Sequence, residues 1–271
     1  MVGVIDHGKR NVLGVLVDAV DYSAAQRRVL RAAHERLPYG VSALAVHGVM
    51  TGVGDDVHRH RLNALDLVTP DGQPVRWALN WLHGTKLTER VCGPELTLRL
   101  CASSAEQRLP VYFYGSTPEV LSALCANLQH RFPTLEIAGA EPSKFRRLAA
   151  YELGEVAKRI RASGARLTFV GLGCPRQEIF TYELRDAVRM PVIAVGAAFD
   201  YHAGLLSVPP RWMQDRGLHW LYRLAQDPKR LWRRYILLSP GYLMLLQAQK
   251  LRLWNPDPVR TVLPTEVVGY G

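Results

Sequence analysis

The stretch that decides the fold class is LTFVGLGCPRQE (Leu167–Glu178), in which an apolar run, a glycine-rich turn and a helix start follow one another. Similar short apolar runs recur along the chain and alternate with helix-like patterns. They are VSALAVHG (Val41–Gly48), LDLVTPDG (Leu65–Gly72), VYFYG (Val111–Gly115) and VIAVGAAF (Val192–Phe199). Strands that are apolar nearly throughout are typical of a parallel sheet buried on both faces. The pattern therefore predicts an α/β protein with helices on both faces of a parallel sheet.

Helix starts are also signalled by the sequence. Pro118–Phe132 and Tyr151–Ser163 have helical patterns, and Ser116-Thr117-Pro118-Glu119 offers a capping hydroxyl and a proline suited to the first turn. Asp227-Pro228 repeats this arrangement and is expected to divide the basic C-terminal region into two helices. We expect three parts: an α/β catalytic core over residues 1–208, a basic, tryptophan-rich helical appendage over residues 209–254, and a loosely ordered tail over residues 255–271.

The composition limits the choice of partners. The chain has 271 residues and a formal net charge of +10, which favours nucleic acid, acidic lipid headgroups or phosphorylated substrates. The N-terminus has no apolar segment typical of a secretory signal. The apolar run Tyr235–Leu246 is too short to cross a bilayer, so any contact with a membrane is expected to be at its surface. The cysteines are expected to be reduced thiols, because their spacing fits no disulfide framework or zinc ribbon: Cys92, Cys101, Cys125 and Cys174.

Three predicted strands end in glycine, at Gly115, Gly171 and Gly196. In open parallel sheets, ligands bind in the crevice beyond the carboxyl ends of the strands. Glycine at such a position lets the backbone turn tightly or approach a ligand closely. Any one of these glycines is explained by an ordinary strand–helix turn, but the three together indicate a nucleotide site.

The turn from Gly171 to Glu178 is the strongest candidate for phosphate binding, because it follows a strand and opens a helix. It contains Gly171 and Gly173, but it lacks the third glycine of a dinucleotide fingerprint and the Gly-Lys-Ser/Thr of a Walker loop. Gln177 is expected to hydrogen-bond a base or sugar hydroxyl. Glu178 is expected either to make the same kind of hydrogen bond or only to stabilise the N-terminus of the helix with its negative charge.

Asp71 is the candidate general base. It lies in Thr69-Pro70-Asp71-Gly72 at the end of a predicted strand, from which its carboxylate can point into the ligand crevice. There it can remove a proton from an acceptor hydroxyl. The alternative is an ordinary Pro-Asp-Gly turn, and the local pattern alone favours that alternative.

The segment Arg211–Arg252 carries most of the net positive charge of the chain, with nine basic residues against two acidic ones. Together with Trp254 just beyond it, the segment also holds four of the six tryptophans. A basic amphipathic helix with tryptophan suits an anionic membrane surface, and arginines suit a diphosphate. The positive charge alone does not decide whether this segment binds lipid headgroups or a diphosphate. The remaining alternative is a solvated face whose tryptophans pack on the core.

No metal or other cofactor is expected. The chain contains no Asp-x-Asp, so positive side chains would have to neutralise a leaving diphosphate. His58-Arg59-His60 is the only close histidine pair. It lies in a polar stretch and is interpreted as a solvated loop rather than a metal site.

Together these segments resemble the WecG/TagA/CpsF glycosyltransferase family. The resemblance runs from about Asn11 to Arg252, and the order and spacing of its blocks are specific. The blocks are Val12–Val15, Val17-Asp18, LDLVTPDGQPVRWA (Leu65–Ala78), Glu89–Gly93, FVGLGCPRQE (Phe169–Glu178), VGAAFDYHAG (Val195–Gly204) and PPRWMQDRGLHWLYRLAQDPKRLWRRY (Pro209–Tyr235).

The resemblance implies an inverting, metal-independent transferase with a Rossmann-like core, at work on the cytoplasmic face of a bacterial membrane. It moves a sugar, N-acetylmannosamine or a related hexose, from a UDP donor to a polyprenyl-diphosphate-linked sugar. The aspartate matching Asp71 is the base. Arg90 belongs to a shared block and is expected to line the donor–acceptor crevice, although an ion pair with an acid such as Glu89 is the alternative. The appendage supplies arginines to the diphosphate, with Arg223, Arg230 and Arg233 the expected ones, and a homo-oligomer is possible.

The chain departs from the family pattern at the end of the second predicted strand. Where relatives commonly carry Thr-x-Asn, this chain has Ala45-Val46-His47. His47 is therefore expected at a position that faces donor or acceptor, and the departure bears on the identity of the sugar.

Two other classes compete with a transferase. A NAD-dependent oxidoreductase is disfavoured because the Gly-x-Gly-x-x-Gly fingerprint and its later ribose-binding acid are missing. A basic nucleic-acid-binding protein is disfavoured because the charge lies beside an apolar, tryptophan-bearing helix and no nucleic-acid-binding module is recognisable. We therefore expect no nucleic acid among the partners.

Overall fold

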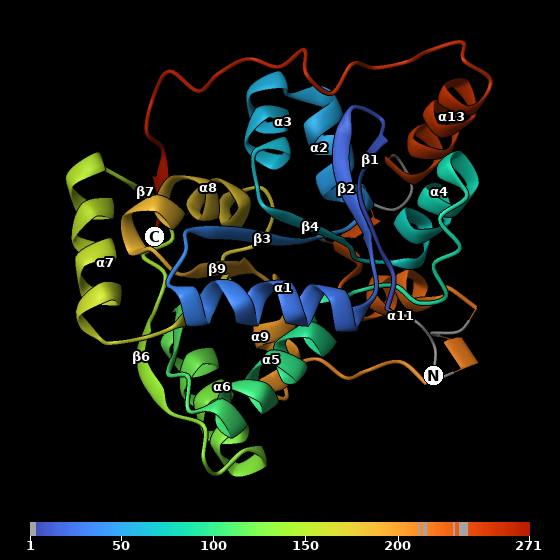
Figure 1. The fold of residues 1–271 in the computed structure, drawn as a ribbon. Helices are drawn as coiled ribbons and strands as arrows, with labels where there is room; N and C mark the ends of the chain where they lie inside the picture. The colour runs from blue at the N-terminus through green and yellow to red at the C-terminus, as the bar shows by residue number, and fades with distance from the viewer. Residues whose placement is uncertain (1–3, 211, 214–215, 230, 233–237) are drawn as a thin grey trace.

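The computed structural model describes residues 4–271 except 211, 214–215, 230 and 233–237. Its centre is a six-stranded sheet in the order β4-β3-β9-β8-β5-β6, and every neighbouring pair is parallel. The strands are β3 (Tyr39–Leu44), β4 (Leu67–Pro70), β5 (Val111–Gly115), β6 (Ile137–Glu141), β8 (Leu167–Gly171) and β9 (Pro191–Ala194). The predicted Rossmann-like α/β fold is confirmed (Figure 1).

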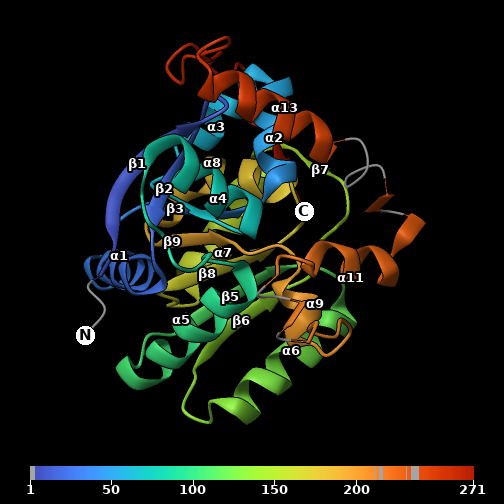
Figure 2. The same ribbon diagram turned by 90° about the vertical axis from the view of Figure 1, so that its right-hand side faces the viewer.

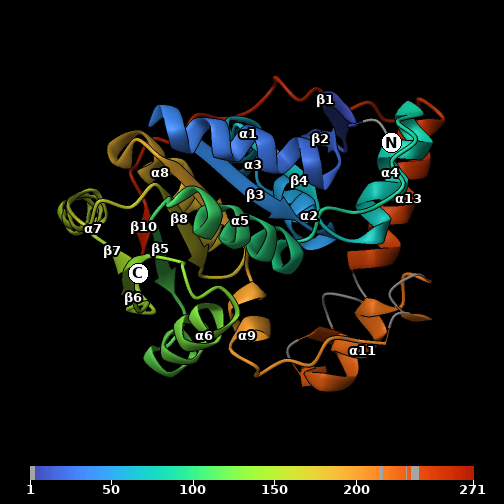
Figure 3. The same ribbon diagram turned by 60° about the horizontal axis from the view of Figure 1, so that its bottom comes forward.

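Helices cover both faces of this sheet. One face packs against α1 (Tyr22–Glu35), α5 (Gly93–Gln107), α6 (Pro118–Arg131) and α9 (Ala198–His202). The other packs against α7 (Ala150–Ala162) and α8 (Arg176–Val188) at one end and against α2 (Val46–Gly54), α3 (Asp56–Asn63), α4 (Gln73–His83) and α13 (Leu238–Lys250) at the other. A further helix, α11 (His219–Gln226), lies beyond the ends of the strands (Figure 3).

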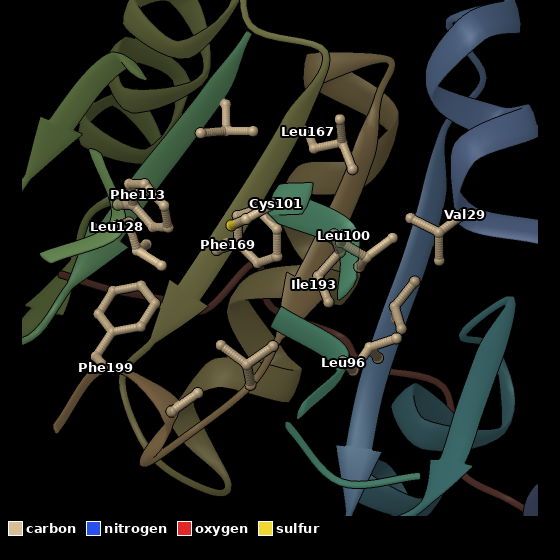
Figure 4. Packing of buried hydrophobic residues seen from close by; sticks show 14 of the residues in the cluster. Val29, Leu96, Leu100, Cys101, Phe113, Leu128, Leu167, Phe169, Ile193 and Phe199 are labelled. Carbon is tan, nitrogen blue, oxygen red and sulfur yellow. The ribbon is translucent and has the colours of Figure 1, made fainter. Parts of the chain in front are cut away.

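Alternation along each strand divides the core between the two faces. Phe113 of β5 stacks on Phe169 of β8 and meets Phe199 of α9 edge to face (Figure 4). Tyr114, the next residue of β5, points to the opposite face and stacks on Phe180 of α8. Both faces of the same strand are therefore buried, which explains why the strands read as continuous apolar runs.

Two predicted strands end earlier than expected. The run Val41–Gly48 was predicted as one strand, but β3 ends at Leu44 and α2 begins at Val46. The run Val192–Phe199 likewise contains β9 and then the start of α9. Apolar residues continue across both junctions because the helix that follows is buried as well, and an apolar run alone does not distinguish a strand from a buried helix.

The first strands form a feature that the sequence pattern did not indicate. β1 (Asp6–Val12) and β2 (Val15–Val20) are a separate antiparallel hairpin that turns at Leu13-Gly14. Asp18 joins this hairpin to the main sheet, because its carboxylate accepts from the Val68 N–H at 2.8 Å. Arg28 of α1 pairs with the same carboxylate at 2.8 Å. Burial raises the pKa of Asp18, and these contacts oppose that effect.

The predicted helix starts are partly borne out in detail. Thr117 is the N-cap of α6, and its hydroxyl accepts from the Val120 N–H at 3.4 Å, with Pro118 in the first turn. Asp227 stands at the C-terminal end of α11, so a helix boundary falls where Asp227-Pro228 predicted one.

The C-terminal part of the chain returns across the molecule. α13 is anchored by Tyr242 and Leu246, which are buried in the core beside α2 and α4. Beyond it the chain runs in extended form past α3, where the amide of Asn63 donates to the Pro258 carbonyl at 2.9 Å. It ends in β10 (Gly269–Tyr270), which pairs with β7 (Arg147–Leu148). Among the described residues, no helix is long and apolar enough to cross a membrane.

Candidate active site

A cavity of about 1550 Å³ lies beyond the carboxyl ends of β3, β4, β8 and β9. Figure 2 looks at this side of the molecule, where α2, α4, α9, α11 and α13 surround the ends of the strands. The structure brings together the predicted site residues that it describes, since all of them line this cavity. They are His47, Asp71, Arg90, Gly171, Gly173, Gln177, Glu178 and Arg223.

Asp71 is held between two strand ends. Its backbone N–H donates to the Leu44 carbonyl at the end of β3 at 3.1 Å and to the Thr69 carbonyl of its own strand at 2.9 Å. Gly72 follows with φ +93° and is the N-cap of α4, so the chain turns sharply into that helix. The half-buried Asp71 side chain lines the cavity at the point where β4 becomes α4.

Arg90 is placed beside Asp71 by backbone contacts. The Val91 N–H donates to the Pro70 carbonyl at 3.1 Å, and the Thr69 hydroxyl donates to the Val91 carbonyl at 3.0 Å. Gly93 then passes so close to β9 that an added Cβ would lie 2.5 Å from the Val195 carbonyl oxygen. The segment therefore needs glycine there, and it carries Arg90 to the cavity wall. Within the described chain no salt bridge of Arg90 is found, so the alternative of an ion pair with Glu89 has no support.

The turn between β8 and α8 forms the floor of the cavity. Gly173 has φ +75°, and its N–H donates to Oε1 of Gln177 at 3.1 Å. Nε2 of Gln177 donates to Oε1 of Glu178 at 2.8 Å, and the Ser42 hydroxyl donates to the same oxygen at 3.1 Å. The Gln177 side chain is thus fixed at both ends, and one backbone N–H that was expected to face phosphate is already used within the turn.

Glu178 is an almost fully buried acid beneath Gln177, with 1% of its surface exposed. Burial raises the pKa of its carboxyl, and the hydrogen bond from Gln177 acts in the opposite direction. Contact with substrate would have to be through this small exposed area. Its clearer effect is to orient Gln177 through their mutual hydrogen bond.

His47 lies in the first turn of α2, at the cavity edge. Ala45 is the N-cap of this helix and has extended backbone angles, but its side chain offers no hydrogen bond to the helix start. A threonine here would supply a capping hydroxyl. Ala45 therefore leaves the start of α2 without a side-chain cap, and His47 places an imidazole at the cavity edge.

Four arginines and four acidic residues (Asp71, Glu95, Glu178 and Asp200) line the cavity. The arginines are Arg90, Arg131, Arg176 and Arg223, and the guanidinium of Arg223 stands 5.6 Å from the ring centre of Tyr201. Arg230 and Arg233, the other predicted contacts, lie outside the described residues.

The cavity continues into an apolar arm that the sequence reasoning did not anticipate. Trp77 and Trp81 of α4 line this part of the cavity together with Leu243 and Leu246 of α13. The two helices lie side by side (Figures 1 and 3), and the Tyr242 hydroxyl donates to the Pro74 carbonyl at 3.3 Å. The sequence did contain a signal for this part of the cavity, because two tryptophans lie one helical turn apart in the helix that follows Asp71.

His58 corrects a prediction. The His58-Arg59-His60 stretch was interpreted as a solvated loop, but it lies in α3, and His58 is only 1% exposed. Asp55 caps the helix by accepting from the His58 N–H at 2.9 Å. Polar neighbours in the sequence suggested solvent exposure, whereas one face of α3 packs on α2 and α8.

The fold and the place of the cavity define a Rossmann-like α/β protein whose ligand site lies beyond the carboxyl ends of the strands. A sequence model of the glycosyl transferase WecG/TagA/CpsF family matches residues 10–256, and the chain belongs to this family. It is therefore a glycosyltransferase of cell-surface polysaccharide synthesis. The family works with a sugar nucleotide donor and a lipid-linked acceptor. Membership confirms the predicted family and removes the support for an oxidoreductase or a nucleic-acid-binding protein.

Proposed function

We propose that this protein transfers a sugar from a UDP donor to a sugar on a polyprenyl diphosphate, with inversion at the anomeric carbon and with Asp71 as general base. The observation that carries this proposal is the position of Asp71. It lines the same cavity as the β8–α8 turn, four arginines and the tryptophans of α4. A polar donor and a lipid-linked acceptor can therefore approach the same carboxylate.

The donor occupies the floor formed by the β8–α8 turn. Gln177 is held by Gly173 and Glu178, so it presents a fixed polar edge to a base or ribose. Arg90, Arg176 and Arg223 face the same space and attract the diphosphate. No Asp-x-Asp occurs in the chain, and these guanidinium groups take the place of a metal in neutralising the leaving UDP. Arg230 and Arg233 remain candidates for the same task.

The chemical step is a single displacement. The Asp71 carboxylate takes the proton of the acceptor hydroxyl as its oxygen attacks the anomeric carbon of the donor sugar. The bond from that carbon to the UDP oxygen breaks, and the electron pair leaves with UDP. Attack opposite the departing group inverts the anomeric centre. His47 lies at the edge of this space and contacts the donor or acceptor sugar.

The acceptor lipid enters along the apolar arm between α4 and α13. Trp77 and Trp81 are 45% and 47% exposed, and Leu243 and Met244 of α13 are 61% and 73% exposed. Exposed tryptophans beside basic residues are typical of surfaces that rest on anionic lipid. We place the protein at the inner face of the cell membrane, with the segment from about residue 209 to 254 as the appendage that docks there.

A screen of UDP-sugars tests this function. The acceptor is a short-chain polyprenyl diphosphate that carries N-acetylglucosamine, and the product is identified by mass spectrometry. We expect one donor to yield a mass increase of one hexose-type residue, with N-acetylmannosamine or a related hexose as the transferred unit. Thermal unfolding should shift upward with UDP but not with NAD or an oligonucleotide. A shift with NAD alone, together with no transfer from any UDP-sugar, would refute the proposal.

A further inference from the structure

A second group of reactive side chains lies at the cavity floor and just behind it, with Cys174 and Glu178 in the cavity lining and His58 outside it. It consists of His58 from α3, Cys174 from the β8–α8 turn and Glu178 from the start of α8. An imidazole nitrogen, the sulfur and a carboxylate oxygen all lie within 4.8 Å of one another. The three residues are far apart in the sequence or on opposite sides of a turn, so the fold, and not a local motif, brings them together.

Two members of this group are buried with polar atoms that lack ordinary partners. His58 and Glu178 are each 1% exposed. Neither ring nitrogen of His58 has a hydrogen-bond partner. The Glu178 carboxylate interacts with the Cys174 thiol within the group, and its Oε2 has no other partner. Buried polar atoms without a protein partner are rare in native proteins, and a bound ion or an ordered water often satisfies them. These atoms converge on the same small space.

We propose that His58, Cys174 and Glu178 bind a divalent zinc ion at the floor of the cavity. Imidazole nitrogen, thiolate sulfur and carboxylate oxygen are the three donor types that zinc takes in proteins. Magnesium and calcium prefer all-oxygen shells, so this set of donors disfavours them. The ligand atoms of tetrahedral zinc lie roughly 3–4 Å apart, so small side-chain rotations bring these three atoms into range.

Charge balance supports the same ion. One carboxylate and one thiolate neutralise a divalent cation, so the occupied site carries no net charge in its buried setting. A metal takes these ligands as carboxylate and thiolate, and any proton that they carry leaves to solvent.

The ion would tie α3 to the β8–α8 turn without entering the reaction. Glu178 orients Gln177, so a zinc ion on the other carboxylate oxygen would stiffen the donor floor from below. Three protein ligands leave a fourth position for water. This site was not expected from the sequence, which predicted no metal, and it does not depend on the donor or acceptor proposed above.

Cobalt(II) titration of the chelator-treated, full-length protein tests the site without any substrate. We expect saturation at about one cobalt per chain, with a thiolate-to-cobalt charge-transfer band and visible bands of tetrahedral cobalt. Zinc added afterwards should remove both. Cys174→Ser should abolish the charge-transfer band, and His58→Gln or Glu178→Gln should weaken cobalt binding by at least about tenfold.

Matched controls come from residues of the same type outside the group. Cys125→Ser, on α6, and His60→Gln, on the same helix as His58, should leave the cobalt spectrum unchanged. The wild-type result alone is decisive if a variant fails to fold. Absence of the charge-transfer band in wild-type protein, or its persistence in Cys174→Ser, would overturn the proposal. If wild-type protein shows the cobalt spectrum but transfers no sugar from any UDP-sugar, the result would count against the proposed function and not against the metal site.

Discussion

Replacing Asp71 with asparagine tests the role of this side chain as a base separately from its role in the fold. Asparagine has nearly the same size, and the backbone N–H of residue 71 still donates to the Leu44 and Thr69 carbonyls. The turn into α4 depends on Gly72 at φ +93°, and no side chain caps the start of this helix. We therefore expect Asp71→Asn to fold normally and to bind UDP with little change, because the proposed donor contacts are other side chains, chiefly Gln177, Arg176 and Arg223.

The loss of turnover follows from the role of a positioned base. Such a group contributes about 100- to 10,000-fold to the rate, which corresponds to roughly 3–5 kcal/mol of transition-state stabilisation. Asp71→Asn should lower kcat by this range and change KM little. The measurement is release of UDP at saturating donor and acceptor, with UDP affinity measured separately by thermal shift.

Asp66 offers a matched control at the other end of the same strand. Its carboxylate accepts from the Gly40 N–H at 2.7 Å, far from the cavity lining, and an asparagine side chain keeps an oxygen for that bond. Asp66→Asn should keep near-normal turnover. Near-normal turnover in Asp71→Asn, or an equal loss in both variants, would refute the assignment of the base.

Three further predictions concern the rest of the cavity. Turnover should continue in EDTA and should not rise with added magnesium or manganese. Loss restored by magnesium or manganese would contradict the arginine-based mechanism, while loss restored only by zinc would point to the His58–Cys174–Glu178 site. Gln177→Ala removes the acceptor of the Gly173 N–H and the donor to Glu178, so we expect the free energy of unfolding to fall by about 1–3 kcal/mol and UDP binding to weaken, as measured by urea unfolding and by titration with UDP. Replacing both Trp77 and Trp81 with serine should reduce binding to anionic vesicles by at least about tenfold, since each ring exposes roughly 100 Å² of apolar surface. The control is Tyr151→Ser on α7, where the ring is 75% exposed, and this variant should bind vesicles as the wild type does. Equal vesicle binding by the wild type, the double variant and the control would count against the apolar arm as the lipid-facing surface.

Much of the fold could be predicted because its signals are local. Buried parallel strands are continuously apolar, as in β5 and β8, and Thr117-Pro118 marks a helix start with groups adjacent in the chain. The β1–β2 hairpin and the switch from β3 to α2 were missed because their sequences have no pattern different from that of their neighbours. Their burial is decided by contacts with distant elements, namely α13 and the end of β4.

The predicted site residues meet for a topological reason. Gly171, Asp71 and the segment containing Arg90 each follow a parallel strand or are hydrogen-bonded to the end of one, and parallel strands end at the same edge of the sheet. Any polar residue just after such a strand is therefore a fair candidate. The apolar arm could not be predicted in this way, because Trp77 and Trp81 become cavity residues only when α13 packs beside α4.

The turn from Gly173 to Glu178 shows why the group formed by His58, Cys174 and Glu178 could not be predicted from the sequence. Gln177 and Glu178 are adjacent in the chain, yet one lines the donor floor and the other points below it toward α3. The direction of each side chain is set by the first turn of α8. The neighbours of Glu178 come from elements more than 100 residues earlier, since the Ser42 hydroxyl of β3 donates to it and His58 of α3 lies within 4.8 Å. A histidine in a polar stretch becomes buried only when α3 packs on α8. The chemistry of the cavity can thus be predicted from strand ends, whereas the group that supports its floor depends on a helix packing that no local pattern encodes.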